Sequence, residues 1–262
     1  MKIAISGKGG VGKTTLAALL AQTYADQGMD VLAVDADPSP CLAGALGLPA
    51  EVRSQLHPIA EMDDLIEERT GAKPGTSGGF FTLNPRVDDL PERFSVLHRG
   101  VRVLEMGSID FGGSGCICPE SAMLKTLFTH LLFRDDEILI IDMYAGVEHL
   151  GRATVDFVDA LLIVVEPTQR SLGTAGQIKD LAEDIGLEKI WLVGNKVRSQ
   201  EEVDFLISAS PGIPLLGTLP MDLGVLEADR RGLPVYDHVH SLQESAQEIA
   251  HKIQNTPETG GV

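Results

Sequence analysis

The sequence predicts an α/β protein with a doubly wound, mainly parallel sheet and helices on both faces. Short apolar segments alternate with helical segments along most of the 262-residue chain, and this alternation is typical of parallel strands joined by helices. The apolar segments are hydrophobic at almost every position, as expected for strands that helices cover on both sides. A chain of this length buries an ample core as one unit. We therefore expect a single domain over residues 1–254.

The elements follow one another in a regular order. The expected strands are residues 1–6, 31–35, 101–106, 138–142, 160–165, 189–193 and 213–219, and the clearest helices are residues 16–27, 120–133 and 241–253. Residues 49–100 fit this order poorly and are interpreted as an elaborated surface excursion. Residues 255–262 lack apolar periodicity, so we expect a flexible tail there.

A glycine-rich turn joins the first strand to the first helix. Residues 7–15 read Gly-Lys-Gly-Gly-Val-Gly-Lys-Thr-Thr, a full-length phosphate-binding loop in the strand-to-helix context that the motif requires. Its backbone N–H groups would bind phosphate oxygens, Lys13 would reach the β- and γ-phosphates, and the Thr14 hydroxyl would ligate Mg²⁺. The sequence therefore predicts a nucleoside triphosphate site formed by Gly9, Gly10, Val11, Gly12, Lys13, Thr14 and Thr15.

Lys8 adds a second cation at the start of this loop. Lys13 already supplies the charge that the β- and γ-phosphates need, and two ammonium groups so close together repel each other unless an anion screens both. A phosphate of a nucleotide bound to a second subunit would be such an anion. Lys8 therefore indicates a dimer interface, and an exposed loop lysine is the alternative.

Two of the predicted strands end in carboxylates. Asp35 ends the strand 31–35 and Asp37 follows two residues later, on the same side if the chain stays extended. Asp142 ends the strand 138–142, and Gly146 follows at the spacing of a γ-phosphate-sensing switch. Ligands bind beyond the carboxyl ends of parallel strands, so these residues should face the phosphates, with Asp142 holding a Mg²⁺-bound water. Turn-forming or strand-capping aspartates are the alternatives.

The choice of base can be argued from a second loop. Asn195, Lys196 and Arg198 resemble the base-recognition loop of nucleotide-binding proteins that select guanine, but Arg198 stands where guanine would need an aspartate. A carboxylate accepts the N1 and N2 hydrogens of guanine, whereas adenine carries a bare N1 acceptor. We therefore expect ATP and ADP, with Asn195 and Lys196 near the base.

A close pair of cysteines precedes the helix 120–133. Cys116 and Cys118 share one face of an extended segment, and Pro119 suits the first position of the helix that follows. Two thiolates leave a four-coordinate metal site half complete. If Lys8 indicates a symmetric dimer, the partner's equal pair would complete an S₄ site for Ni²⁺, Zn²⁺ or an iron–sulfur cluster. Two thiols without a metal are the alternative.

The overall charge limits the choice of partner. Lys and Arg number 21 against 38 Asp and Glu, a net charge of −17 that would be repelled by phosphate backbones and anionic membranes. No apolar run approaches the roughly 18 residues of a membrane span, and the N-terminus lacks the apolar core of a signal peptide. We expect a cytoplasmic protein that binds neither nucleic acid nor membrane.

The loop Lys-Gly-Gly-Val-Gly-Lys-Thr-Thr resembles the deviant Walker A motif of the MinD, ParA and nitrogenase iron protein class of P-loop ATPases. This resemblance implies that Lys8 crosses a dimer interface to the partner's nucleotide. It also implies that Asp37 positions or deprotonates the attacking water, which would place Asp35 nearer to Mg²⁺. The segment around Pro220 and Asp222 matches a base-contacting segment of the class. The expected catalytic residues are Lys8, Lys13 and Asp37.

A narrower resemblance rests on Ser-Gly-Cys-Ile-Cys-Pro-Glu and on Asp-Met-Tyr-Ala-Gly-Val-Glu-His-Leu-Gly-Arg, which are similar to segments of the CooC-type ATPases of carbon monoxide dehydrogenase maturation. It implies a nucleotide-dependent homodimer that binds nickel or zinc through Cys116 and Cys118. Its client would be carbon monoxide dehydrogenase, into whose cluster it assists nickel insertion.

Two other functions use the same loop. An iron–sulfur cluster carrier or electron-donating ATPase would hold a cluster between the four cysteines of a dimer. A ParA- or MinD-like positioning ATPase would need a basic surface or a basic amphipathic helix, and the helix 241–253 carries little positive charge.

Overall fold

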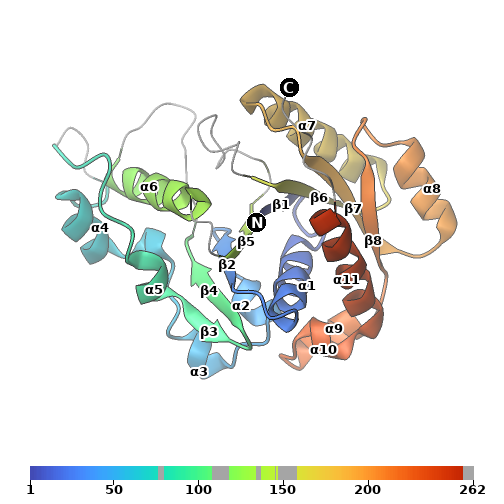
Figure 1. Ribbon diagram of the computed structural model, residues 1–262, viewed down its shortest axis with the longest axis horizontal. Helices are drawn as coiled ribbons and strands as arrows, with labels where there is room; N and C mark the ends of the chain where they lie inside the picture. Colours follow the sequence, from blue (N-terminus) through green and yellow to red (C-terminus); the bar gives the residue numbers. More distant parts are fainter. Residues whose placement is uncertain (76–79, 108–117, 134–136, 145, 147–157, 256–262) are drawn as a thin grey trace.

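One sheet of eight strands runs through the described part of the chain (Figure 1). The computed structural model describes residues 1–75, 80–107, 118–133, 137–144, 146 and 158–255. The strands are β1 (Lys2–Gly7), β2 (Val31–Ala36), β3 (Val96–His98), β4 (Val101–Glu105), β5 (Ile138–Met143), β6 (Ala160–Val165), β7 (Ile190–Val197) and β8 (Leu215–Pro220). Their order is β3-β4-β2-β5-β1-β6-β7-β8, and only β3 and β4 pair antiparallel. The predicted mainly parallel sheet is confirmed.

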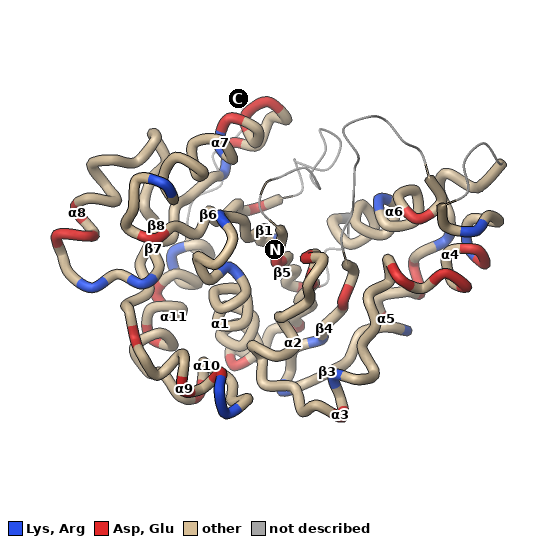
Figure 2. Tube along the Cα trace, turned by 180° about the vertical axis from the view of Figure 1, so that it is seen from behind, with Lys and Arg blue, Asp and Glu red and all other residues tan. Residues whose placement is uncertain are grey.

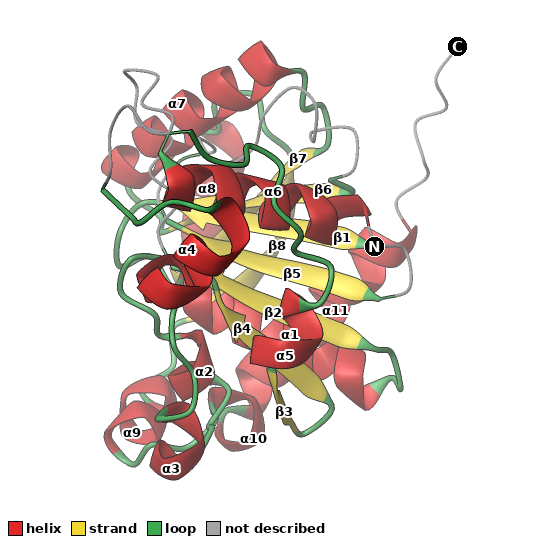
Figure 3. Ribbon diagram, turned by 90° about the vertical axis from the view of Figure 1, so that its left-hand side faces the viewer, coloured by secondary structure: helices red, strands yellow, loops and turns green. Residues whose placement is uncertain are grey.

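Helices cover both faces of this sheet, as predicted (Figure 3). One face carries α1 (Lys13–Asp26), α2 (Leu42–Ala45), α10 (Val235–His238) and α11 (His240–Asn255). The other carries α4 (Asp63–Thr70), α6 (Pro119–Phe133), α7 (Gln169–Ile185) and α8 (Gln200–Ser208). The shorter helical segments are α3 (Ala50–Arg53), η1 (Ile59–Glu61), α5 (Leu90–Phe94) and α9 (Gly224–Arg230).

The central strands are buried on both faces. Every residue of β1, β2, β5 and β6 is buried. Because neighbouring strand residues point to opposite faces, Ile3 and Ile5 join the core beneath α1 while Ala4 joins the core on the other side. This double burial explains why these segments are hydrophobic at almost every position.

The structure differs from the sequence prediction at several element boundaries. β7 continues to Val197 instead of ending at residue 193, with irregular pairing to β8 between Gly194 and Val197. β3 was not predicted, because three residues are too few to show a periodicity. Residues 49–100 contain α3, η1, α4, α5 and β3. Asn255 ends α11, and the rest of the predicted tail, 256–262, lies outside the described residues.

The strand order also positions the site. β1 lies between β5 and β6, and the chain fills the sheet first on the β2 side of β1 and then on the β6 side. Such a reversal leaves a crevice beyond the carboxyl ends of the central strands, where ligands of α/β sheets bind. The loop after β1 and the last residues of β2, β5 and β7 meet at this edge.

The surface carries charges of both signs. Lys and Arg are interspersed with the more numerous Asp and Glu along the trace (Figure 2). Among the described helices, none combines the length and the hydropathy needed to cross a membrane.

Candidate active site

The phosphate-binding loop follows β1 directly and leads into α1. Gly10 and Gly12 have φ angles of 80° and 99°, which only glycine adopts readily. Gly12 precedes α1, and this helix has neither a side-chain cap nor an acidic residue in its first turn. Its first N–H groups therefore remain for an anion. Lys13 is buried at the same helix end, whereas Lys8, Gly9 and Gly10 are exposed at the start of the loop.

At two positions of this loop, close neighbours leave room for glycine alone. A Cβ on Gly7 would lie 2.4 Å from the carbonyl oxygen of Val164 in β6, and a Cβ on Gly12 would lie 2.1 Å from the Asn195 amide nitrogen. Both distances are far below van der Waals contact. Glycine at these positions therefore lets the loop pack against β6 and β7.

β7 contacts the outer side of the phosphate loop through two residues predicted to lie near the base. Asn195 is buried, and its Nδ2 donates to the Val11 carbonyl at 2.7 Å. Lys196, with a φ of 59°, donates from Nζ to the Gly10 carbonyl at 2.9 Å. The second Nδ2 hydrogen of Asn195 is left for another acceptor. The contact of these residues with adenine stays a prediction.

Asp142 forms a hydrogen bond with Thr14 at the N-terminal end of α1. Asp142 is 1% exposed, and burial raises the pKa of its carboxyl to about 7, opposed by a hydrogen bond with Thr14 and by the charge of Lys13. Its Oδ1 is buried without a hydrogen-bond partner. A buried orphan oxygen beside a threonine hydroxyl fits an octahedral Mg²⁺ that keeps several waters. The residues present therefore fit the predicted magnesium site.

Asp35 lies beside Asp142 on the neighbouring strand, in direct register. It is fully buried, and burial raises the pKa of its carboxyl while three backbone N–H bonds oppose this effect. These donors are the N–H groups of Asp37 at 3.1 Å, Cys41 at 2.8 Å and Leu42 at 2.9 Å. Asp35 thus holds the loop after β2, and its predicted role near Mg²⁺ stays a prediction.

Asp37 sits on the loop that Asp35 holds. It is half-buried, and its Oδ1 accepts the N–H of Ser39 at 2.9 Å. That bond leaves the Oδ2 oxygen for a water. The geometry agrees with the expected position of Asp37 at the carboxyl end of β2, while its catalytic role stays a prediction.

Ser6 connects the end of β1 to the segment after β5. Its hydroxyl donates to the Gly146 carbonyl at 2.7 Å and accepts the Gly146 N–H at 3.1 Å. The N–H predicted to sense the γ-phosphate is therefore bound to Ser6 in this structure. Sequence reasoning missed Ser6, although a hydroxyl directly before the phosphate loop was a signal for it.

Of the predicted base-side residues, Pro220 ends β8 and Asp222 follows it. Pro220 is half-buried, and both carboxylate oxygens of Asp222 are used within the protein. Oδ1 accepts the Gly224 N–H at 2.8 Å and Oδ2 accepts the Ser241 hydroxyl at 2.9 Å. Asp222 thus fixes this loop to the start of α11.

The cysteine pair is described only in part. Cys118 directly precedes α6, carries a half-buried free thiol, and donates from Sγ to the Ser121 hydroxyl at 3.0 Å. Pro119 begins α6, as predicted. Cys116 lies outside the described residues. Within the residues that are described, no three His, Cys, Asp or Glu side chains gather as a metal site.

Comparison with known proteins defines the class of this chain. A family model of the CobQ/CobB/MinD/ParA nucleotide-binding domain, CbiA, matches residues 2–235. The chain belongs to this family, and the fold and phosphate loop are those of a P-loop ATPase.

Individual proteins of this family are similar to the chain over nearly its full length. The chain is 47% identical, over 97% of its length and 94% of the relative's, to the carbon monoxide dehydrogenase accessory protein CooC of Rhodospirillum rubrum. It is 43% identical to an ATP-binding protein of Methanocaldococcus jannaschii, over 97% of this chain and 96% of that one. Among solved structures, the MinD cell division protein of Aquifex aeolicus has a TM-score of 0.67 at 21% identity, covering 98% of both chains. That likeness concerns the fold.

Proposed function

We propose that this chain is a dimeric ATPase that assists nickel insertion into carbon monoxide dehydrogenase. The observation that carries this proposal is its 47% identity to CooC over nearly the full length of both proteins. The phosphate loop and the hydrogen bond of the buried Asp142 with Thr14 support the nucleotide part of the proposal. The thiol of Cys118 at the start of α6 supports the metal part.

In the proposed reaction, the chain positions ATP for attack by water. The loop N–H groups and Lys13 bind the β- and γ-phosphates, and Asn195, Lys196, Pro220 and Asp222 lie on the base side. Thr14 and Asp142 would hold Mg²⁺, directly or through water, with Asp35 nearby. The ion would neutralise charge on the phosphate oxygens. Asp37 would orient the attacking water and accept its proton.

The proposed dimer explains two features of one chain. Lys8 is exposed at the start of the phosphate loop, where it can reach a neighbour's nucleotide. Cys116 and Cys118 supply half of a tetrahedral thiolate site, so two protomers would together bind one Ni²⁺ or Zn²⁺ as cargo. ATP and ADP would then control metal binding, because both ligands depend on the same interface.

The metal site is tested by cysteine substitution. With Mg·ATP present, so that the proposed dimer forms, changing both Cys116→Ser and Cys118→Ser should abolish tight Ni²⁺ and Zn²⁺ binding, measured as the metal that stays with the protein after gel filtration. ATP affinity should change less than twofold. Cys41→Ser is the matched control, because Cys41 is a free thiol that precedes α2, on the other face of the sheet from α6. Unchanged metal affinity in the double variant would rule out the cysteine site.

An iron–sulfur carrier is the second candidate, because four cysteines of a dimer can also hold a [4Fe–4S] cluster. Anaerobic reconstitution with iron and sulfide distinguishes the two. A broad visible absorbance band with stoichiometric iron and sulfide would favour the cluster, and its absence together with one Ni²⁺ per dimer would favour the metallochaperone.

A further inference from the structure

Glu166 was not among the expected site residues, but it contacts the phosphate loop through Lys196. The Nζ of Lys196 lies between two oxygens, the Gly10 carbonyl at 2.9 Å and the Glu166 Oε1 at 2.5 Å. Glu166 directly follows β6, and Lys196 lies near the end of β7, the strand paired with it. The two side chains therefore form an ion pair across the carboxyl ends of adjacent strands.

Glu166 is itself held in place. Its N–H donates to the Ser171 hydroxyl at 3.1 Å, and Ser171 lies in the first turn of α7. The Thr168 side chain caps this helix by accepting the Ser171 N–H. These bonds fix the backbone of Glu166, and with it the position from which its side chain extends.

The orientation of the Gly10 peptide decides what the phosphate loop can bind. Phosphate oxygens are attracted by N–H groups and repelled by carbonyl oxygens, so the loop carbonyls must point outward. Carbonyl oxygens that point outward still need hydrogen-bond donors from the protein or from water. Lys196 supplies one to Gly10, and Asn195 supplies one to Val11.

The geometry points to Glu166 as a positioning residue for the nucleotide phosphates. Its carboxylate holds the Lys196 ammonium on the outer side of the loop, so that the Gly10 carbonyl stays turned away from the ligand. The inferred role of Glu166 concerns the phosphates and not the base. This inference rests on the nucleotide part of the proposed function and is independent of the metal cargo.

The test compares a ligand that has a base with one that has none. Glu166→Gln keeps the size of the side chain and removes its charge. We expect it to weaken binding of both Mg·ATP and Mg·tripolyphosphate, measured by calorimetry, by the same factor of about two to five. This is the range that partly exposed ion pairs support. The exposed side-chain fractions of Lys196 and Glu166 are 42% and 32%.

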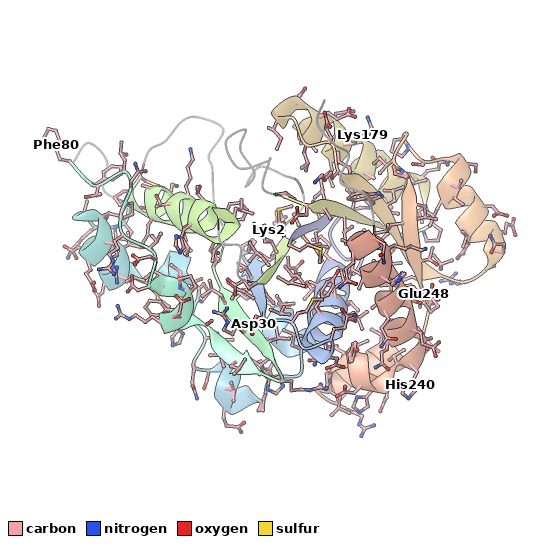
Figure 4. The ribbon with its side chains drawn as sticks, in the orientation of Figure 1. Lys2, Asp30, Phe80, Lys179, His240 and Glu248 are labelled. Atoms are coloured by element: carbon pink, nitrogen blue, oxygen red, sulfur yellow. The ribbon has the colours of Figure 1, made fainter. Side chains whose placement is uncertain are left out.

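The matched control is Glu183→Gln, which breaks the ion pair with Lys179 on α7 and changes the net charge equally (Figure 4 labels Lys179). It should leave both affinities unchanged. In a Lys196→Met background, Glu166→Gln should cause no further loss, because the two residues act through one contact.

Three outcomes would overturn the inference. They are unchanged affinity for both ligands, a loss confined to ATP, and additive losses in the double variant. A wild-type protein that binds neither ligand would overturn the proposed function as well, so the two failures can be distinguished.

Discussion

Asp142 shows at the residue scale how burial prepares a cation site. The carboxyl group is almost fully buried, has one oxygen without a partner, and has a pKa raised to about 7. Desolvation is the main cause, because a buried carboxylate loses the water that stabilises its charge. A Mg²⁺ ion with its waters would restore that stabilisation. The nucleotide-free protein is therefore less stable than it would be with a neutral residue here.

The buried position of Asp142 predicts that the free energy of unfolding decreases as pH rises. Between the ordinary carboxyl pKa of 3.8 and about 7, the unfolded chain releases the Asp142 proton while the folded protein keeps it. The folded state binds more protons, so stability falls as pH rises, by at most about 1.4 kcal/mol per pH unit from this group. We expect Asp142→Asn to stabilise the nucleotide-free protein more at pH 8 than at pH 5 in urea unfolding. A difference independent of pH would contradict the raised pKa.

At the scale of elements, the site depends on strand ends that approach one another closely. β6 and β7 touch the phosphate loop through the Val164 carbonyl and through Asn195 and Lys196. The irregular pairing of β7 with β8 occurs where Asn195 and Lys196 lie. An extended strand would point successive side chains to opposite faces. The irregularity and the positive φ of Lys196 let both side chains reach one loop.

At Gly7, the close contact with β6 leaves no room for a larger side chain. Gly7→Ala should lower the free energy of unfolding by about 2–4 kcal/mol, because the new Cβ would lie 2.4 Å from a backbone oxygen at a φ of 146°. Chemical denaturation of the nucleotide-free protein measures this loss.

The control for Gly7 is Gly173→Ala within α7, where an added Cβ would meet no atom within 4 Å. It should be neutral or should stabilise the protein by up to about 1 kcal/mol, because alanine favours helices. Equal effects of the two substitutions would show that the contact with β6 is unimportant.

At the scale of the whole molecule, the proposed dimer would have to form against charge repulsion. Each chain carries −17, so two copies repel each other at long range. A lysine that reaches the partner's triphosphate would offset this repulsion only when nucleotide is bound. Dimerisation should therefore depend on ATP.

Lys8→Ala tests this dependence. We expect the variant to bind Mg·ATP, because Lys13 remains, but to lose dimerisation in sedimentation velocity and to hydrolyse ATP about 100-fold more slowly. Lys189→Ala, which removes the same charge at the amino end of β7, is the control and should behave as the wild type. Normal turnover by Lys8→Ala would exclude a role of this lysine across the interface.

Much of the site could be predicted from local patterns. The strand-to-helix loop, the aspartates near the ends of β2 and β5, and the start of α6 at Pro119 depend on neighbouring residues in the sequence. The structure has the loop between β1 and α1, Asp35 and Asp142 one residue before the ends of their strands, and Pro119 at the start of α6. The short β3 and the extension of β7 were missed. Their strand geometry depends on pairing with β4 and β8, which no local periodicity reveals.

The sequence by itself determined the class of fold, the phosphate loop and the acidic charge, because these follow from periodicity, motif spacing and composition. Only the tertiary structure decided which groups share the space around the loop. It paired Ser6 with Gly146, Lys196 with Glu166 and Gly10, and Asp35 with the loop after β2. The physical reason is that hydrogen bonds and burial depend on distance in space, which the order of strands across a sheet sets independently of their order in the chain.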